Sequence, residues 1–366
     1  MMKVLIAAGG TGGHIYPGIA VANEILRRDE KSEILFVGTA RGLESKIVPQ
    51  NGFQLSLITS IGLKNVGFLG KLKGIGVLPI SFIEAAKLLR EFKPDVVVGA
   101  GGYVSGPVLL AAAMLGLPTL VMDSNALPGW TNRRLARFVD KATVSFQEAL
   151  PYFRGKGVLT GNPVRSEFFE IPAKQRDAKR FDLLIFGGSQ GARAINDAMI
   201  AALPHLTEKK SVLHVTHQTG ESEFDKVQRG YEAADWQASA DVKRYIDDMV
   251  GEFARADLII CRAGATTSAE LVAAGKAAIM IPFPLAADDH QRKNAEALVR
   301  GGAARMILQK DLSGERLASE IMALLDEPER ITEMEIASQK LARRDAAAAT
   351  VELMEELSGT QLTSQI

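Results

Sequence analysis

The sequence predicts an α/β protein with two doubly wound domains, and three observations lead to this prediction. Glycine-rich loops occupy 9–13 and 187–191, each directly after a short apolar run typical of a buried parallel strand. Strand-like and helix-like patterns alternate through both halves, as a parallel sheet requires. The 366 residues also exceed the ~250–300 at which a single core stops growing. We therefore expect two nucleotide-type domains facing one cleft.

The apolar runs predict the strands of both sheets. The predicted strands of the first half are 4–7, 34–37, 54–58, 96–98, 119–122 and 142–145, and those of the second half are 183–186, 212–215, 242–246, 258–261, 278–281 and 304–307. Helical patterns lie between most of them, for example at 19–27 and 82–92. After residue 312 the pattern is helical to about residue 357, and Pro328 opens one helix.

Two stretches bear on how the chain divides. Residues 96–122 carry no charge and are long enough to span a bilayer, but glycines and prolines break them into strand, loop, helix and strand. Residues 150–173 are rich in proline and glycine, which predicts an interdomain connection. We predict an N-terminal domain at 1–160, a C-terminal domain at 161–345, and a C-terminal helix and tail at 346–366.

Composition narrows the class of protein. The single cysteine, Cys261, excludes a disulfide framework, and we expect it to be a small apolar residue at a strand end. Residues 1–160 hold 18 Lys/Arg against 11 Asp/Glu, or +7, and the remainder holds 25 against 32, or −7. The basic half favours an acidic surface or an anionic ligand, and we expect no nucleic acid partner. The first apolar run reaches glycine too soon for a signal peptide.

The first glycine loop departs from a dinucleotide-binding fingerprint. Gly10-Thr11-Gly12 supplies G-x-G, but Ile15 stands at the third glycine position and no carboxylate ends the second strand. Two interpretations remain open, an anion cradle at a helix start and a tight structural turn. His14 follows the loop and is either an incidental residue or a general base, a role that the ordinary histidine pKa of ~6.5 suits.

Two loops in the second half follow predicted strands. Thr267 and Glu270 have the spacing of a capping box, but a carboxylate at the carboxyl end of the sheet could instead accept both hydroxyls of a ribose. Spacing alone leaves both interpretations open. The loop 282–291 is rich in polar groups that could hold a sugar. Its acid pair and His290 could also bind a metal, although no other His/Cys cluster supports a metal site.

A segment of the first half is basic and apolar together. From 45 to 83 the sequence has no acid, and within 62–82 apolar residues alternate with Lys64, Lys71 and Lys73. One interpretation is a loop that leads into a helix. The other is an interfacial patch that presses apolar groups into a membrane while the lysines meet anionic headgroups.

Taken together, these motifs resemble the MurG family, the glycosyltransferases that make lipid II for peptidoglycan. The resemblance covers roughly residues 3–345, and its motifs occur in family order. The matching motifs are Gly9-Gly10-Thr11-Gly12-Gly13-His14, Gly101-Gly102-Tyr103-Val104-Ser105-Gly106-Pro107, Gly161-Asn162-Pro163-Val164-Arg165, Gly187-Gly188-Ser189-Gln190-Gly191-Ala192, Ile246-Asp247-Asp248-Met249, Cys261-Arg262-Ala263-Gly264, Ala269-Glu270 and His290-Gln291.

The resemblance implies two Rossmann-like domains of the GT-B type, with UDP-N-acetylglucosamine bound mainly by the C-terminal domain and a lipid-linked acceptor by the N-terminal one. It implies inverting transfer of N-acetylglucosamine to the C4 hydroxyl of lipid I by a peripheral enzyme at the cytoplasmic side of the membrane. It implies no metal and no cofactor. The implied ligand-binding residues are Ile246 for uracil, Glu270 for ribose, Arg165, Ser189, Ala265 and Thr266 for phosphates, Gln291 and Asn125 for the sugar, and Thr11, Gly12 and Gly13 near the reacting phosphates.

The chain departs from the family pattern at one place. Met122-Asp123-Ser124-Asn125 stands where the family usually has His-Glu-Gln-Asn, so the asparagine is kept and a shorter carboxylate replaces glutamate. An inverting transfer needs a base for the acceptor hydroxyl and stabilisation for the departing UDP. We predict that His14 is the base, with Asp123 as the alternative.

Other functions fit the same fold. A UDP-sugar epimerase would need neither a lipid acceptor nor a membrane patch, so the 62–82 segment favours the transferase. A nicotinamide oxidoreductase would want the missing third glycine and strand-end acid. A two-domain solute-binding protein would normally carry an export signal.

Overall fold

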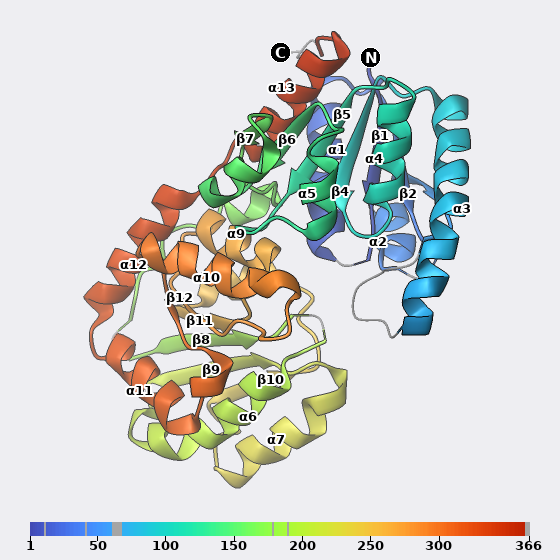
Figure 1. Ribbon diagram of the computed structural model, residues 1–366. Helices are drawn as coiled ribbons and strands as arrows, with labels where there is room; N and C mark the ends of the chain where they lie inside the picture. The colour runs from blue at the N-terminus through green and yellow to red at the C-terminus, as the bar shows by residue number, and fades with distance from the viewer. Residues whose placement is uncertain (11, 41, 61–67, 178, 189, 363–366) are drawn as a thin grey trace. The chain divides into compact units, whose positions relative to one another are not determined.

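The computed structural model describes residues 1–362 except 11, 41, 61–67, 178 and 189, and for 68–77 and 287 it describes the backbone alone. The chain forms two compact units (Figure 1). Unit 1 comprises Met1–Arg165 and Arg343–Ile366, and unit 2 comprises Ser166–Ala342. The sequence prediction instead divides the chain after 160 and 345. The C-terminal helix belongs to unit 1.

Unit 1 is built on a seven-stranded sheet in the order β3-β2-β1-β4-β5-β6-β7, in which neighbouring strands are parallel. Its strands are β1 (Lys3–Ala8), β2 (Glu33–Gly38), β3 (Gln54–Leu57), β4 (Val96–Gly101), β5 (Thr119–Asp123), β6 (Lys141–Val144) and β7 (Gly157–Leu159). Its α-helices are α1 (Gly12–Arg28), α2 (Glu44–Gln50), α3 (Phe68–Phe92), α4 (Ser105–Met114), α5 (Trp130–Leu135) and α13 (Ala346–Ser358).

Both faces of this sheet are covered. Alternate residues of a strand point to opposite faces, so Val4 and Ile6 of β1 join a core with α1 and α13, while Leu5 and Ala7 join a core with α3 and α4. Burial on both faces explains why the central strands β1, β4 and β5 are nearly continuous apolar runs rather than alternating ones.

Unit 2 repeats the architecture with a six-stranded parallel sheet in the order β10-β9-β8-β11-β12-β13. Its strands are β8 (Phe181–Phe186), β9 (Leu213–Gln218), β10 (Ala240–Lys243), β11 (Leu258–Cys261), β12 (Ala278–Met280) and β13 (Ala304–Met306). Its α-helices are α6 (Arg193–Ala202), α7 (Phe224–Ala233), α8 (Met249–Arg255), α9 (Ala265–Ala273), α10 (His290–Arg300), α11 (Gly314–Leu325) and α12 (Pro328–Leu341).

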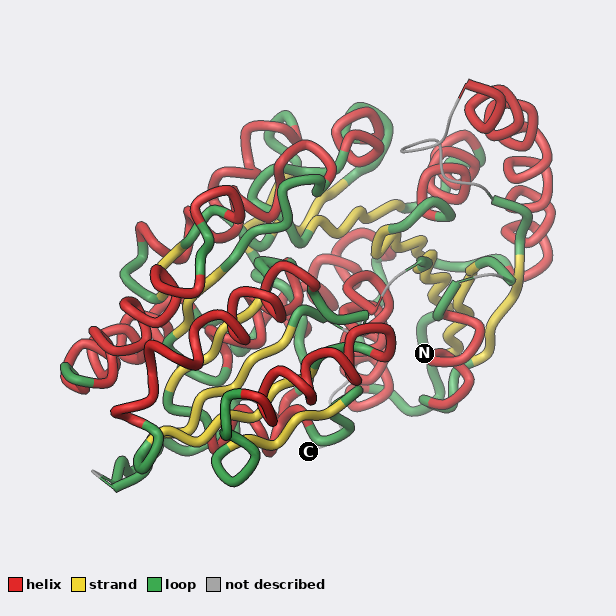
Figure 2. Tube along the Cα trace, turned by 90° about the horizontal axis from the view of Figure 1, so that it is seen from below, coloured by secondary structure: helices red, strands yellow, loops and turns green. Residues whose placement is uncertain are grey.

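The predicted α/β class with two doubly wound sheets is confirmed, and every predicted strand is present. The alternation of strand and helix can be followed along the trace in Figure 2. Pro328 opens α12, as predicted. The prediction missed β7, a three-residue edge strand inside the stretch interpreted as a connection. The uncharged stretch 96–122 folds as β4, α4 and β5. Among the described residues, no helix combines the length and apolarity needed to cross a bilayer.

Candidate functional site

The first glycine loop joins β1 to α1 at the carboxyl edge of the unit 1 sheet. Gly9 donates its N–H to the carbonyl of Gly101, which ends the neighbouring strand β4, at 3.3 Å. Gly10 donates its N–H to Glu44 at 2.9 Å. This amide, which a pure anion cradle would offer to a ligand, is therefore already paired with a carboxylate. Thr11 lies outside the described residues.

His14 lies in the first turn of α1 and is half-buried. Its ring packs against Gly101, where a Cβ would come within 2.1 Å of Nδ1 and where φ is +123°. Only glycine allows this approach and this backbone conformation together. The hydroxyl of Ser105 accepts the N–H of Gly101 at 3.0 Å, and its oxygen lies 2.8 Å from the carbonyl oxygen of Ala7 and 2.7 Å from that of Gly101. Ser105 thus ties β1, which carries Ala7, to β4, which ends at Gly101.

Asp123 ends β5 and is buried. Its carboxylate accepts the N–H groups of Asn125 and Gly129, both at 3.0 Å, and Nδ2 of Asn132 at 2.9 Å. Burial is the largest influence on this group and raises the pKa of Asp123, while these hydrogen bonds oppose the rise. Three donors on one carboxylate favour a role in shaping the loop that presents Asn125.

Arg165 is the last residue of the continuous first part of unit 1 and is exposed. Its guanidinium carbon lies 5.7 Å from the ring centroid of Tyr16, a cation–π distance. Tyr16 is two residues beyond His14 on α1. Unit 1 therefore brings a cation and the candidate base to the start of the same helix.

The second glycine loop joins β8 to α6 and is supported by uncharged groups. Gln218 donates Nε2 to the carbonyl of Gly188 at 2.9 Å and accepts the N–H of Ile246 through Oε1 at 2.8 Å. At Gly191 a Cβ would come within 1.8 Å of the Thr219 carbonyl, so the loop packs directly on the backbone that follows β9. Ser189 lies outside the described residues.

A series of hydrogen-bonded, buried polar side chains supports this contact. Asn196 donates Nδ2 to the carbonyl of Thr219 at 3.0 Å, so its Oδ1 is the acceptor for His217 Nε2 at 3.1 Å. His217 Nδ1 then accepts the hydroxyl proton of Tyr231, also at 3.1 Å. Burial lowers the pKa of His217 to about 3 and raises the pKa of Tyr231. Both groups are therefore neutral at physiological pH.

The start of helix α9 excludes one of the two interpretations of Thr267 and Glu270, the capping box. Gly264 is its N-cap, so Ala265 and Thr266 are the first two helical residues and their amides belong to the positive end of the helix. Thr267 is the third helical residue, so the capping-box interpretation of Thr267 and Glu270 is wrong. Glu270 is half-buried in the second turn.

Glu270 also lies close to the end of β11. Burial, and secondarily the charge of Glu270, raise the pKa of Cys261, the last residue of that strand. Cys261 is fully buried, as predicted for a small apolar residue at a strand end.

Gln291 lies in the first turn of α10, so the predicted loop 282–291 ends two residues earlier, at Asp289. Gln291 accepts the N–H of Phe283 through Oε1 at 2.9 Å. Asp288 and Asp289 precede α10 with φ of 55° and 56°, and consecutive left-handed non-glycine residues persist only where the surroundings hold them. Arg262 donates to the carbonyl of Ile281 at 3.0 Å, and burial lowers its pKa to about 10.

Sequence reasoning missed several supporting residues because their partners are distant in the chain. They are Glu44, Asn196, Gln218, His217 and Arg262. Their signal would have been polar residues inside or directly beside otherwise apolar strands and helix starts, as at His217 and Gln218 in β9.

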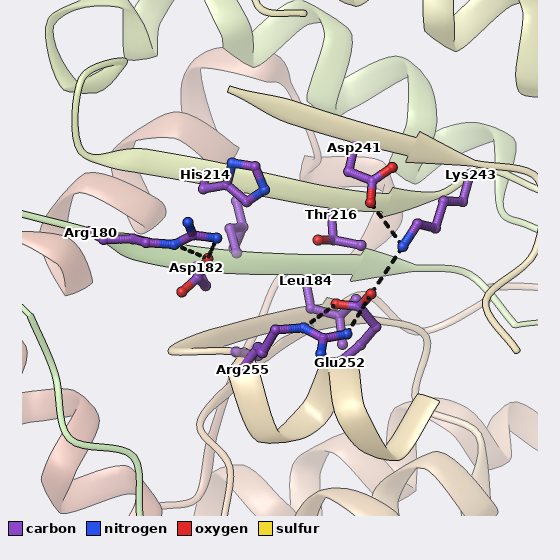
Figure 3. A pocket seen from close by; sticks show the side chains of 11 residues that line it. Arg180, Asp182, Leu184, His214, Thr216, Asp241, Lys243, Glu252 and Arg255 are labelled. Carbon is purple, nitrogen blue, oxygen red and sulfur yellow. Dashed lines mark hydrogen bonds and ion pairs between the residues drawn. The ribbon is translucent and has the colours of Figure 1, made fainter. Parts of the chain in front are cut away.

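A pocket of about 190 Å³ lies elsewhere in unit 2, between strands β8 to β10 and helix α8 (Figure 3). Its charges neutralise one another, since Lys243 and Arg255 both pair with Glu252, at 3.1 and 3.0 Å. None of the predicted site residues lines it, and we assign it no ligand. Among the described residues, no group of three or more His, Cys, Asp or Glu is placed to hold a metal ion.

Comparison with known proteins gives consistent matches along the whole chain. The glycosyltransferase family 28 N-terminal domain matches residues 4–144, and the family 28 C-terminal domain matches residues 182–350. Two similar curated proteins carry the name UDP-N-acetylglucosamine–N-acetylmuramyl-(pentapeptide) pyrophosphoryl-undecaprenol N-acetylglucosamine transferase. The one from Myxococcus xanthus is 49% identical over 98% of this chain and 93% of its own length. The one from Geobacter sulfurreducens is 48% identical over 96% and 98%.

Solved structures agree with these matches. The crystal structure of Acinetobacter baumannii MurG aligns with a TM-score of 0.78 at 30% identity, covering 97% of this chain and all of the other. A UDP-GlcNAc 2-epimerase from Neisseria meningitidis, bound to UDP-GlcNAc, aligns with a TM-score of 0.69, covering 97% of this chain and all of the other. At 14% identity, the second match shows a shared fold alone.

Proposed function

The chain belongs to the MurG family of glycosyltransferases, and from this membership we propose that it transfers N-acetylglucosamine from UDP-N-acetylglucosamine to lipid I, giving lipid II. The observation that carries the proposal is the identity of nearly half of all residues with transferases of that name, from one end of the chain almost to the other. The 2-epimerase likeness is one of fold.

We place the acid–base chemistry in unit 1. His14 takes the proton of the acceptor C4 hydroxyl, the freed oxygen bonds to the anomeric carbon of N-acetylglucosamine, and the bond from that carbon to UDP breaks with inversion. His14 fits the base role because it opens α1 beside the glycine loop and is only half-buried. Asp123 is the weaker candidate, since three donors already occupy its carboxylate.

We place recognition of the UDP moiety in unit 2. The charge of Glu270 suits the two ribose hydroxyls. The carbonyl of Ile246 suits a uracil N–H, because the Ile246 amide is already donated to Gln218. The amides of Ala265 and Thr266, at the positive end of α9, suit the diphosphate.

The remaining binding roles follow the family resemblance. Ser189 and Arg165 would meet phosphates, Gln291 and Asn125 the donor sugar, and Thr11 to Gly13 the region of the reacting phosphates. These dipoles and Arg165 would stabilise the charge that develops on the departing UDP.

We further propose that unit 1 meets an anionic membrane surface through 62–82, which makes the protein peripheral at the cytoplasmic side. Residues 61–67 lie outside the described part, but α3 continues the segment. Three apolar side chains toward the middle of α3 are exposed, Leu78, Ile80 and Ile83, and Ile83 is 66% exposed. Exposed apolar groups on a helix that also carries Lys71 and Lys73 in its sequence fit an interfacial contact.

A single assay tests the reaction. Purified protein is incubated with UDP-N-acetylglucosamine labelled in the sugar and with lipid I, and the lipid fraction is then counted. We expect label in the lipid and a matching release of UDP. Label that stays on the nucleotide as a changed sugar, with no need for lipid, would instead identify an epimerase.

A further inference from the structure

Glu44 is a fully buried carboxylate beside the first glycine loop. It is the first residue of α2, and its Oε2 accepts the Gly10 N–H at 2.9 Å. Its Oε1 accepts both the N–H and the hydroxyl of Thr39, each at 2.8 Å. One side chain thus joins the turn after β1 to the turn after β2.

The surrounding backbone leaves space for this carboxylate. A Cβ at Gly42 would lie 1.9 Å from Glu44 Oε2, and a Cβ at Gly38 would lie 2.4 Å from its Cγ. Real Cβ atoms do not approach so closely, so both positions must lack a side chain for Glu44 to turn inward. The pattern Gly38-Thr39…Gly42…Glu44 therefore encodes a socket for the carboxylate.

The backbone connects the hydrogen bond between Glu44 and Gly10 to the candidate base, His14. Gly10 follows Gly9, whose N–H is donated to Gly101, and Gly101 is the residue against which the ring of His14 packs. In a dinucleotide-binding fold, an acid at the end of the second strand binds a ribose. Here the acid, Glu44, comes six residues after that strand, and its carboxylate accepts a hydrogen bond from the glycine loop itself.

We propose that Glu44 is a positioning residue that sets the conformation of the first glycine loop and, through Gly101, the place of His14. This inference rests on the proposed transferase function for its kinetic consequence. Its structural consequence, an ordered loop, is independent of any activity.

The chain offers a matched control in the same unit. Glu84 on α3 accepts the N–H and the hydroxyl of Thr59, at 2.6 and 3.2 Å, which repeats the contact of Glu44 with Thr39. Glu84 is not buried and makes no described contact with the glycine loop. Glu84→Gln therefore changes the same chemical groups away from the loop.

The first test compares Glu44→Gln with Glu84→Gln in the transfer assay. Glutamine has one oxygen, so its amide nitrogen would face either Gly10 or Thr39, and a buried donor would lose its acceptor. We expect kcat to fall at least about tenfold in Glu44→Gln, while UDP affinity and the KM for UDP-N-acetylglucosamine stay within about twofold. Glu84→Gln should match wild type. A Glu44→Gln enzyme with wild-type kcat, or one that loses donor affinity in parallel, would overturn the proposal.

The second test measures hydrogen exchange of the segment 9–16 and needs no activity. We expect amide exchange at least about tenfold faster in Glu44→Gln than in wild type, with peptides of unit 2 unchanged. Unchanged exchange at 9–16 would overturn the proposal even if the transferase function holds. Thr39→Ser keeps the hydroxyl and should resemble wild type in both tests. Thr39→Val removes the hydroxyl, so it should lower kcat and speed amide exchange at 9–16, as expected for Glu44→Gln.

Discussion

The two glycine-rich loops open helices in the same way, but a charged side chain supports the first and neutral side chains support the second. In unit 1 the carboxylate of Glu44 accepts the amide of Gly10. In unit 2 the neutral amide of Gln218 holds the carbonyl of Gly188, and the neutral ring of His217 stands behind the next turn. A buried anion opposes the binding of a second anion close by, whereas neutral supports do not.

This difference bears on which unit receives the diphosphate of the donor. A loop supported without charge adds no negative charge to unit 2, where the positive end of α9 also lies. A loop that holds a carboxylate suits the positioning of a base in unit 1. The comparison thus supports the proposal that unit 1 carries the acid–base chemistry and unit 2 binds the donor, and each of the following changes tests that division.

The largest expected effect comes from removing the candidate base. His14→Ala should lower the turnover rate by ~10²–10⁴-fold, the usual contribution of a positioned base. UDP affinity should not change, because the proposed contacts of UDP lie mostly in unit 2. The loss of rate toward acid pH should also disappear, since protonation of His14 is what would stop the base. Initial rates across pH and calorimetric UDP binding measure both effects.

His205→Ala, at an exposed position of unit 2, is the control and should behave as wild type. A loss of rate below about tenfold would move the base role to Asp123. A parallel loss of UDP affinity would make His14 a binding or structural residue and would break the division between the units.

The next effect concerns the basic character of unit 1. Replacing Lys64, Lys71 and Lys73 with Glu should abolish sedimentation with anionic vesicles, because each lysine near such a surface contributes ~1 kcal/mol. Binding to neutral vesicles should change little. The matched control replaces three exposed lysines of unit 2, Lys179, Lys310 and Lys340, which alters net charge equally. If the variant of Lys64, Lys71 and Lys73 sediments like wild type, the 62–82 segment has no membrane role.

The sequence predicted the central strands well because burial on both faces makes them nearly continuous apolar runs, as in β1, β4, β8 and β11. It also predicted the two loops, since glycine next to such a run has few other uses. The sequence could not predict which side chains hold the two glycine loops in place. From the sequence alone, Glu44 looks like an ordinary acidic residue in the first turn of a helix. The polar residues of β9 look like breaks in an apolar strand. In both cases the hydrogen-bond partners lie in other elements. The capping-box prediction was wrong because α9 begins at Ala265, two residues before Thr267, and Gly264 is its N-cap.

A smaller effect tests donor binding in unit 2. Glu270→Gln should weaken UDP binding at least about tenfold, or ~1.4 kcal/mol, because hydrogen bonds from hydroxyls to a charged group are worth ~1.5–3 kcal/mol. Thermal stability should change little, since Glu270 does not cap α9. Glu329→Gln, at an exposed position on α12, is the control. Unchanged UDP affinity in Glu270→Gln would remove the ribose assignment and leave the neutral loop of unit 2 without its proposed ligand.

The last prediction tests whether the His217 side chain, which supports the second loop, is neutral. The pKa of His217 falls from about 6.5 in the unfolded chain to about 3 in the folded one because of burial. Between these values the unfolded chain binds a proton that the folded chain does not, so stability falls as pH falls from 6.5 toward 3. One such proton contributes a slope of at most ~1.4 kcal/mol per pH unit.

The slope is isolated by comparing wild type with His217→Gln in urea unfolding at pH 6.0, 5.5, 5.0 and 4.5. Glutamine can still bond to Asn196 or Tyr231 but cannot take up a proton, so the difference in unfolding free energy between the two proteins should narrow as pH falls. Other titrating groups are common to both proteins and cancel. A constant difference would mean that His217 is charged in the folded protein, and the second loop would then rest on a cation. The contrast with the carboxylate-held loop of unit 1 would survive in that case, but as a contrast between opposite charges rather than between charged and neutral supports.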